Sequence, residues 1–490
     1  MNDRPTAALG ALLAATLLAA PAARAADEFT LLLKPLRDGA NVTALEVREE
    51  LHGGAPADGA PLRFQAPHGV FGVKVIADHI AGLTVSDAAG DVPLLVSDDA
   101  RSDNGDVSYR HWQAARATVF PVSVRYRIAV QDAAEQGPPY GMKAAGQGVA
   151  GSGFGFLLLP ENTRSTATQV RWDLSDLPAG SVGVITAGKG DAVVNGAPAA
   201  LNDQWMLAGP AQTLAWARTP AFHAYLIGQP PFDAAATLEW ADRAYGHLAD
   251  SLRYLGTPEY NLLLRALDVP SFSTGTASTG GGGSLITLGN RLDKQDLDSV
   301  HNTIFHEMTH QWVGGFDGGG VWFSEGLTTY FSAVLPCEAG LATPAFCAAG
   351  VNDFAGYYYD AGEARNWSLA KIDATVGRED VRRVPYGRGM LYFAQLNAQL
   401  LKKSHGERNL QAALAPLFIA RQRGEPLDQR AWEAMLRREL GEAAVTGFRR
   451  DVLDGATTIV PPSDAFGPCL KRVAAHGKAG YRWQPSGACR

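Results

Sequence analysis

Cysteine, excess positive charge and long apolar runs are all scarce in this chain. Only four cysteines occur among 490 residues, and none stands in C-x-x-C spacing, which argues against a zinc site built from cysteine. Lys and Arg number 43 against 50 Asp and Glu, and a net charge of −7 without a basic patch excludes a nucleic-acid-binding protein. After the N-terminal segment no run is long and apolar enough to cross a bilayer, so no stable membrane insertion is expected.

The strongest apolar run, residues 7–20, lies at the N-terminus and predicts an export signal. It follows a weakly positive start at Arg4, is too short for a membrane span, and precedes the A-x-A site Ala23-Arg24-Ala25. We interpret residues 1–25 as a cleaved signal peptide; a disordered alanine-rich tail is the alternative. Export predicts a periplasmic or secreted protein.

The even number of cysteines agrees with export, because disulfides persist outside the cytoplasm. Four cysteines allow three pairings. The favoured one joins neighbours, Cys337 with Cys347 and Cys469 with Cys489, because it closes two short loops. Free thiols are the alternative.

Chain length and pattern predict an α+β multidomain protein. Short apolar segments separated by Gly, Pro, Asp and Asn fill residues 26–230, and predict an N-terminal β-sandwich-like domain without chemistry of its own. The expected strands are Glu28–Lys34, Asn41–Glu49, Gly69–Ile76, Ser123–Val130, Val170–Leu174 and Ser181–Ile185.

Helical spacing dominates residues 231–459, which we expect to form the catalytic domain. Its first helix is expected at Ala234–Leu255. Strands are expected at Asn261–Leu267 and Ser284–Leu288, with a Ser/Thr/Gly loop over Ser271–Gly283 between them. Residues 460–490 are expected to form a disulfide-tied C-terminal tail.

The stretch Leu297–Phe331 carries the motif His306-Glu307-x-x-His310. On a helix, residues four apart lie on the same face, so the two histidines can present imidazole nitrogens to one metal ion. Glu307 then stands beside them, where a general base acting on a metal-activated water is needed. Apolar residues at helical spacing support the helix; they are Leu297, Val300, Ile304 and Met308. The alternative is a buried helix whose histidines make ordinary hydrogen bonds.

A second helix is expected after the glycine-rich turn of residues 314–320, with Glu325 near its start. Catalytic zinc takes three protein ligands and keeps one open position. The turn would fold the second helix back beside the first and bring Glu325 next to the histidines. The sequence therefore predicts a site for one Zn²⁺ ion formed by His306, His310 and Glu325.

The segments H-E-M-T-H-Q-W and W-F-S-E-G-L-T-T-Y resemble the gluzincin metallopeptidases, and are most similar to the glycyl aminopeptidase and aminopeptidase N families. The resemblance covers about residues 236–440. It implies a thermolysin-like, mainly helical catalytic domain with a small edge-exposed sheet, which hydrolyses peptide bonds in a peptide or protein substrate. It also implies that Tyr386, in Tyr-Gly-Arg-Gly, donates a hydrogen bond to the oxyanion. A turn tyrosine at a helix entrance is the alternative.

In those families the strand before the metal helix borders the active site, and an extended substrate binds along its edge. The resemblance therefore implies substrate binding by Gly282, Gly283 and Ser284, with a flexible surface loop as the alternative. The carboxylate that holds a substrate's free amine in those aminopeptidases is missing, since no acidic residue lies between Phe272 and Leu292. The linker before Glu325 is also shorter than is usual in the aminopeptidase N family.

These departures leave three functions open. The first is a zinc metallopeptidase, aminopeptidase-like or cutting within chains. The second is a non-catalytic peptide-binding protein on a peptidase fold. The third is a zinc hydrolase of a non-peptide bond.

Overall fold

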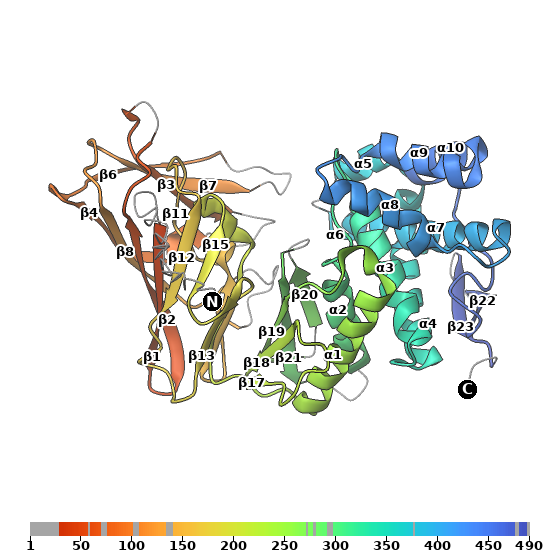
Figure 1. Ribbon diagram of the computed structural model, residues 1–490, viewed down its shortest axis with the longest axis horizontal. Coiled ribbons are helices and arrows are strands. Elements are labelled where there is room, and N and C mark those ends of the chain that lie inside the picture. Colours follow the sequence, from red (N-terminus) through yellow and green to blue (C-terminus); the bar gives the residue numbers. More distant parts are fainter. Residues whose placement is uncertain are drawn as a thin grey trace, which may run out of the picture.

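The computed structural model describes residues 29–56, 59–69, 76–100, 107–133, 141–270, 273–277, 281–291, 297–375, 378–475 and 480–487. The expected signal peptide lies outside these ranges. Strands fill the N-terminal part, a small sheet occupies the middle, and helices form the C-terminal part (Figure 1). This arrangement confirms the α+β class.

Three sheets form the N-terminal part. Strand β1 pairs antiparallel with β2 and parallel with β12. Along β1 the buried residues alternate, Phe29, Leu31 and Leu33, as the period of two in a half-buried strand requires. One hydrophobic core serves these sheets. The largest has the order β15 (Ala192–Asn195), β12 (Ala167–Trp172), β1 (Phe29–Asp38), β2 (Asn41–Leu51), β8 (Val122–Ala129), β4 (Ile80–Asp87) and β5 (Gly90–Asp91).

The other two sheets of this part are smaller. One has the order β11 (Leu159–Pro160), β3 (Arg63–Gly69), β7 (Ser108–Ala114) and β6 (Leu94–Asp98). The other has the order β14 (Gly188–Lys189), β13 (Val182–Ile185), β16 (Trp205–Gly209), β10 (Gly148–Ser152) and β9 (Lys143–Ala145). Five of the six expected strands overlap β1, β2, β8, β12 and β13. The sixth, Gly69–Ile76, falls mainly outside the described residues; Gly69 ends β3, and Ile76 begins a 3-10 helix, Ile76–His79.

The middle sheet has the order β17 (Gln212–Thr213), β18 (Phe222–Ile227), β19 (Tyr260–Pro270), β21 (Gly283–Arg291) and β20 (Ser273–Ala277). Strand β20 pairs antiparallel with β21 and is the last strand of the sheet in the described part of the chain. The expected loop over Ser271–Gly283 was therefore wrong for residues 273–277. The expected edge strand was wrong as well, because β21 lies between β19 and β20. The chain enters this sheet at β17, ahead of the expected domain boundary at residue 230.

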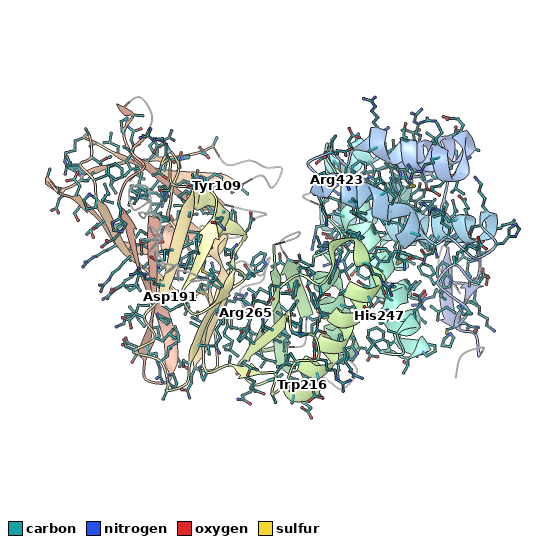
Figure 2. The ribbon with its side chains drawn as sticks, viewed as in Figure 1. Tyr109, Asp191, Trp216, His247, Arg265 and Arg423 are labelled. Atoms are coloured by element: carbon teal, nitrogen blue, oxygen red, sulfur yellow. A yellow bond between two sulfur atoms is a disulfide. The ribbon has the colours of Figure 1, made fainter. Side chains whose placement is uncertain are left out.

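Arg265 of β19 links the middle sheet to the N-terminal part (Figure 2). Its side chain is fully buried, and it donates hydrogen bonds to the Gly141 carbonyl at 2.6 Å and to Thr287 Oγ1 at 2.8 Å. Burial lowers the pKa of Arg265 to about 9. A buried guanidinium needs its hydrogen bonds satisfied, and the bonds to the carbonyls of Gly141 and Ala150 join the middle sheet to the N-terminal part, while the bond to Thr287 stays within the middle sheet.

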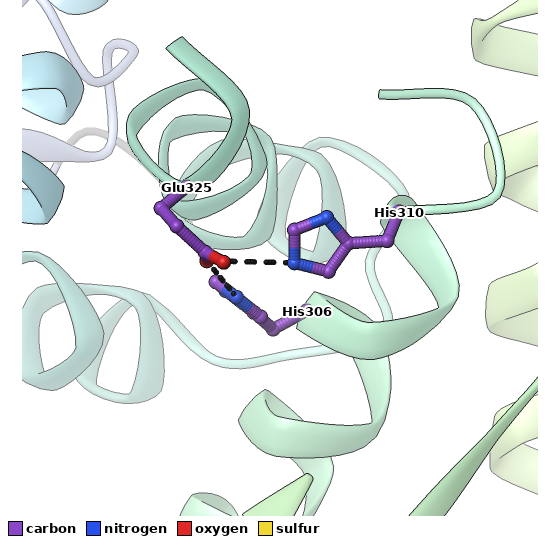
Figure 3. Close-up of side chains that lie close together, drawn as sticks. All are labelled: His306, His310 and Glu325. Atoms are coloured by element: carbon purple, nitrogen blue, oxygen red, sulfur yellow. Dashed lines mark hydrogen bonds and ion pairs between the residues drawn. The ribbon is translucent and has the colours of Figure 1, made fainter. Parts of the chain in front are cut away.

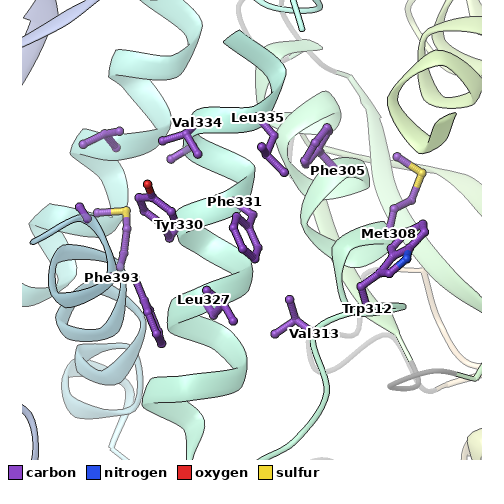
Figure 4. Close-up of a cluster of buried hydrophobic side chains, with 14 of the residues drawn as sticks. Phe305, Met308, Trp312, Val313, Leu327, Tyr330, Phe331, Val334, Leu335 and Phe393 are labelled. Atoms are coloured by element: carbon purple, nitrogen blue, oxygen red, sulfur yellow. The ribbon is translucent and has the colours of Figure 1, made fainter. Parts of the chain in front are cut away.

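Ten helices are described in the C-terminal part, and they share one apolar core with the middle sheet (Figure 4). Figure 4 shows side chains of the α2 segment facing those of α3, with Phe393 of α7 on the opposite side of α3. None of the described helices is long and apolar enough to cross a membrane. The helices are α1 (Ala234–Ser251), α2 (Leu297–Thr309), α3 (Val321–Glu338), α4 (Pro344–Tyr359), α5 (Leu369–Asp373), α6 (Glu379–Arg382), α7 (Val384–Lys403), α8 (Leu410–Gln422), α9 (Gln429–Leu440) and α10 (Glu442–Phe448).

A disulfide joins Cys337, at the end of α3, to Cys347 in α4, and confirms that pairing. The other expected pair, Cys469 with Cys489, includes Cys489, which lies outside the described residues. The chain closes with the hairpin of β22 (Leu470–Ala474) and β23 (Tyr481–Pro485), which packs on α4.

Candidate metal centre

Three ligand-type side chains converge from α2 and α3 (Figure 3). Nε2 of His306 lies 3.1 Å from Glu325 Oε2, and Nε2 of His310 lies 3.4 Å from the same oxygen. All three ligand atoms lie within 4.8 Å of one another. The helix expected for H-E-x-x-H is α2, so the structure brings together the three residues that the sequence predicted as ligands.

The turn between α2 and α3 is held by the segment that connects α8 and α9. Asp317 accepts a hydrogen bond from the Leu427 N–H at 2.8 Å, and its own N–H donates to the Leu427 carbonyl at 2.8 Å. Gly318 and Gly319 have φ angles of 87° and 98°, which residues other than glycine rarely adopt. These contacts reverse the chain within a short linker and return α3 beside α2.

A glycine-to-glycine contact sets the crossing of α3 and α7. A Cβ on Gly326 would lie 2.5 Å from the Gly389 Cα, and a Cβ on Gly389 would lie 2.1 Å from the Trp322 carbonyl oxygen. Only glycine allows backbones this close. Because Glu325 precedes Gly326 and Tyr386 lies on α7, this crossing brings both residues to one site. The Tyr386 ring centroid is 6.4 Å from that of His306.

The ionisation of Glu325 and the protonation of His310 favour each other. Burial opposes ionisation of Glu325, but His310 and His306 outweigh it and hold the pKa of Glu325 well below its usual range. Burial likewise opposes protonation of His310, but Glu325 outweighs it and raises the pKa of His310 to about 9. The carboxylate therefore stays ionised and is balanced by positive charge. A bound divalent cation satisfies the same requirement.

The donor set fits a metal ion. His306 Nδ1 is buried without a hydrogen-bond partner among the described residues, while its Nε2 faces the other ligands. His310 Nδ1 lies 3.3 Å from Thr328 Oγ1, which orients the ring with Nε2 toward Glu325. Two imidazoles and one carboxylate are a ligand set of catalytic zinc. Sequence reasoning missed Thr328, although it follows Glu325 by three residues and so lies on the same helix face.

Glu307 and Tyr386 flank the ligands. Burial raises the pKa of Glu307, with the two histidines opposing this shift and Glu325 adding to it. Burial, followed by Glu325 and Glu307, raises the pKa of Tyr386 well above its usual value. Tyr386 therefore keeps its proton as a hydrogen-bond donor. It lies in the first turn of α7, which begins at Val384.

The glycine segment expected to bind substrate begins β21. The Gly282 N–H donates to Gln311 Oε1 at 3.0 Å. Gly283 pairs with Asn261 of β19, and Ser284 is fully buried with its Oγ accepting from the Tyr260 hydroxyl at 2.9 Å. The protein itself supplies the partners of these groups, and in the described part of the chain the neighbouring β20 forms the edge of the sheet. Substrate binding at Gly282, Gly283 and Ser284 stays a prediction.

No family model and no curated protein matches the chain. Solved structures do. An aminopeptidase N family protein from Idiomarina loihiensis matches with a TM-score of 0.69 at 13% identity, over 89% of this chain and 77% of that chain. A mutant of an M1 zinc metallopeptidase from Deinococcus radiodurans matches with a TM-score of 0.51 at 16% identity, over 89% and 95%. Native yeast LTA4 hydrolase matches with a TM-score of 0.51 at 13% identity, over 89% and 69%. At these identities the likeness concerns the fold, and this chain has the fold of the M1 zinc metallopeptidases.

Proposed function

We propose that this protein is an exported zinc-dependent metallopeptidase. One observation carries the proposal: His306, His310 and Glu325 converge on one point, with the buried Glu307 next to His306 on α2 and His310 directly after the end of that helix. The fold shared with zinc metallopeptidases supports it. We also assign residues 26–230 as a scaffold domain and residues 231–459 as a thermolysin-like catalytic domain, with β17 and β18 added to its sheet.

Each residue of the site has a defined task in this proposal. His306, His310 and Glu325 would hold one zinc ion, which would supply the Lewis acidity that makes a water molecule nucleophilic near neutral pH and polarises a carbonyl group. Glu307 accepts the proton of that water and delivers it to the leaving amine, and its raised pKa suits both transfers. Tyr386, which stays protonated, donates a hydrogen bond to the negative charge that develops on the carbonyl oxygen.

The substrate in this proposal is a peptide in extended conformation along β20. An edge strand presents backbone N–H and C=O groups to which another strand can add. Among the described strands, β20 provides such an edge, and it lies beside α2. A mutant of the Deinococcus radiodurans enzyme has been solved with a bound Tyr-Ser-Ala substrate, at a TM-score of 0.50 and 17% identity to this chain. That neighbour supports peptides as the substrate class.

Export is supported by the disulfide between Cys337 and Cys347, since such bonds are rare in reducing compartments. The missing amine-binding carboxylate favours cleavage that does not require a free N-terminus. Mass spectrometry of a peptide pool after digestion separates the two cases. Cuts only after first residues would establish an aminopeptidase, and internal cuts would establish an endopeptidase.

The proposal is tested by Glu307→Gln. We expect the variant to retain zinc and to lose nearly all hydrolysis, because the amide cannot take the water proton. Glu259→Gln, which changes a glutamate whose side chain is 76% exposed, is the control and should keep full activity. Zinc retention together with unchanged hydrolysis in Glu307→Gln would exclude the assigned base. Zinc without hydrolysis in the wild type would favour a non-catalytic peptide-binding protein.

A further inference from the structure

Hydroxyl contacts set the register of β20 against α2. Ser273 Oγ lies 2.9 Å from Thr303 Oγ1 and 3.0 Å from Ser299 Oγ, and both partners are on α2. Two residues of a strand advance about 6.8 Å, and one four-residue turn of helix advances about 6 Å. A strand residue two positions on therefore stays level with a helix residue four positions on. Gly275 follows Ser273 by two residues, and Glu307 follows Thr303 by four.

Gly275 contacts the Glu307 side chain as this register requires. A Cβ at position 275 would lie 2.3 Å from Glu307 Cγ, 2.6 Å from Oε1 and 2.7 Å from Cδ. Every one of these distances is shorter than a carbon atom tolerates. The side chain of Glu307 thus lies directly against the bare α-carbon of β20.

The backbone at position 275 does not itself require glycine. Gly275 is absent from the residues of positive φ in the described chain, and it pairs with Ile286 as an ordinary antiparallel residue. Glycine weakens a strand and often marks a close approach of another group. Here the approaching group is Glu307. Ala277, two residues along on the same face of β20, already carries a methyl group.

We propose that Gly275 is a positioning residue that confines the Glu307 carboxylate beside the histidines, with Ser273 and Thr303 holding β20 in the required register. A methyl group at this position displaces the Glu307 side chain from its place. The catalytic consequence rests on the proposed function, whereas the steric contact does not.

The kinetic test is Gly275→Ala. We expect kcat to fall about 100-fold, since a displacement of about 1 Å of a catalytic group has an effect of this size. KM should change less than about threefold, and the zinc content should remain that of the wild type. Gly447→Ala, at a glycine whose added Cβ meets nothing within 4 Å, is the control and should leave kcat unchanged. A wild-type kcat in Gly275→Ala would overturn the proposal.

A second test measures the contact without using activity. Gly275→Ala should lower the Tm of the wild type but not that of Glu307→Ala, which lacks the atoms that the methyl group meets. An equal fall of Tm in both backgrounds would show that the methyl group clashes with something other than Glu307. If Gly275→Ala alone does not fold, the double variant should fold, and its failure to do so would equally reject the contact. Should Glu307→Gln retain full turnover, the proposed function fails while this cycle still reports on the contact.

Discussion

From the close crossing of α3 and α7 we predict that Gly389→Ala lowers both the unfolding free energy and the turnover of the protein. The new methyl group would lie 2.1 Å from the Trp322 carbonyl oxygen and 2.7 Å from the Gly326 Cα. An ordinary contact needs at least about 3.3 Å, so the helices must separate by about 1 Å. Overpacking of this kind costs about 1–3 kcal/mol of unfolding free energy. The same shift moves Tyr386 away from Glu325, and a misplacement of about 1 Å lowers turnover by about 100-fold.

Urea unfolding and steady-state kinetics measure the two effects separately. Gly387 is not a suitable control, because a Cβ there would lie 2.2 Å from the Phe354 carbonyl oxygen. Gly447→Ala in α10 is suitable, because it adds a methyl group to a helical glycine in open space. We expect a lower urea midpoint and a lower kcat in Gly389→Ala only. Wild-type stability and wild-type kcat in that variant would refute the argument that this contact brings α3 and α7 into register.

Two further predictions concern α2 and its contacts. Thr328→Val should weaken zinc binding by about tenfold, measured in competition with a chelator, because the hydroxyl group that orients His310 is lost. Thr328→Ser keeps the hydroxyl and should keep the affinity for zinc. Equal zinc affinities in the two variants would show that the hydroxyl does not orient His310. Burial, with Arg243 adding to it, lowers the pKa of His301 from 6.5 to about 4, where its ring stacks on Trp240 at 4.1 Å. As pH falls from about 6.5 to 4, His301 is protonated in the unfolded chain before it is protonated in the folded chain. The free energy of unfolding should therefore decrease by up to about 3 kcal/mol. In zinc-free protein His301→Leu should show a flatter dependence of Tm on pH over this interval, and an unchanged slope would contradict the assignment.

The cluster of His306, His310 and Glu325 was predictable because its geometry is local or follows from what a zinc site would require. A spacing of four residues places His306 and His310 on one helix face, and zinc's need for a third ligand points to the next acidic residue after a tight turn, which is Glu325. The spacing of three residues places Thr328 on the same helix face as Glu325, but it does not show that Thr328 contacts His310. That contact depends on the packing angle between α2 and α3.

Strand β20 shows why the rest of the site could not be predicted. Residues 273–277 are Ser, Thr, Gly, Thr and Ala, and glycine favours neither strand nor helix, so a loop was the natural expectation. The segment is a strand because β21 pairs with it and α2 packs against it. The contact with α2 joins residues as far as 30 positions apart, such as Ser273 and Thr303, so no local pattern predicts it. The close approach of Gly326 to Gly389 could not be predicted either, because it depends on which two helices cross.

The central claim is that His306, His310 and Glu325 hold one divalent cation. Elemental analysis of wild type and His310→Ala, after dialysis against buffer with trace zinc, tests it most directly. We expect about one zinc ion per wild-type chain and almost none in the variant, because two remaining ligands bind zinc weakly. Equal zinc content in both proteins would contradict the account.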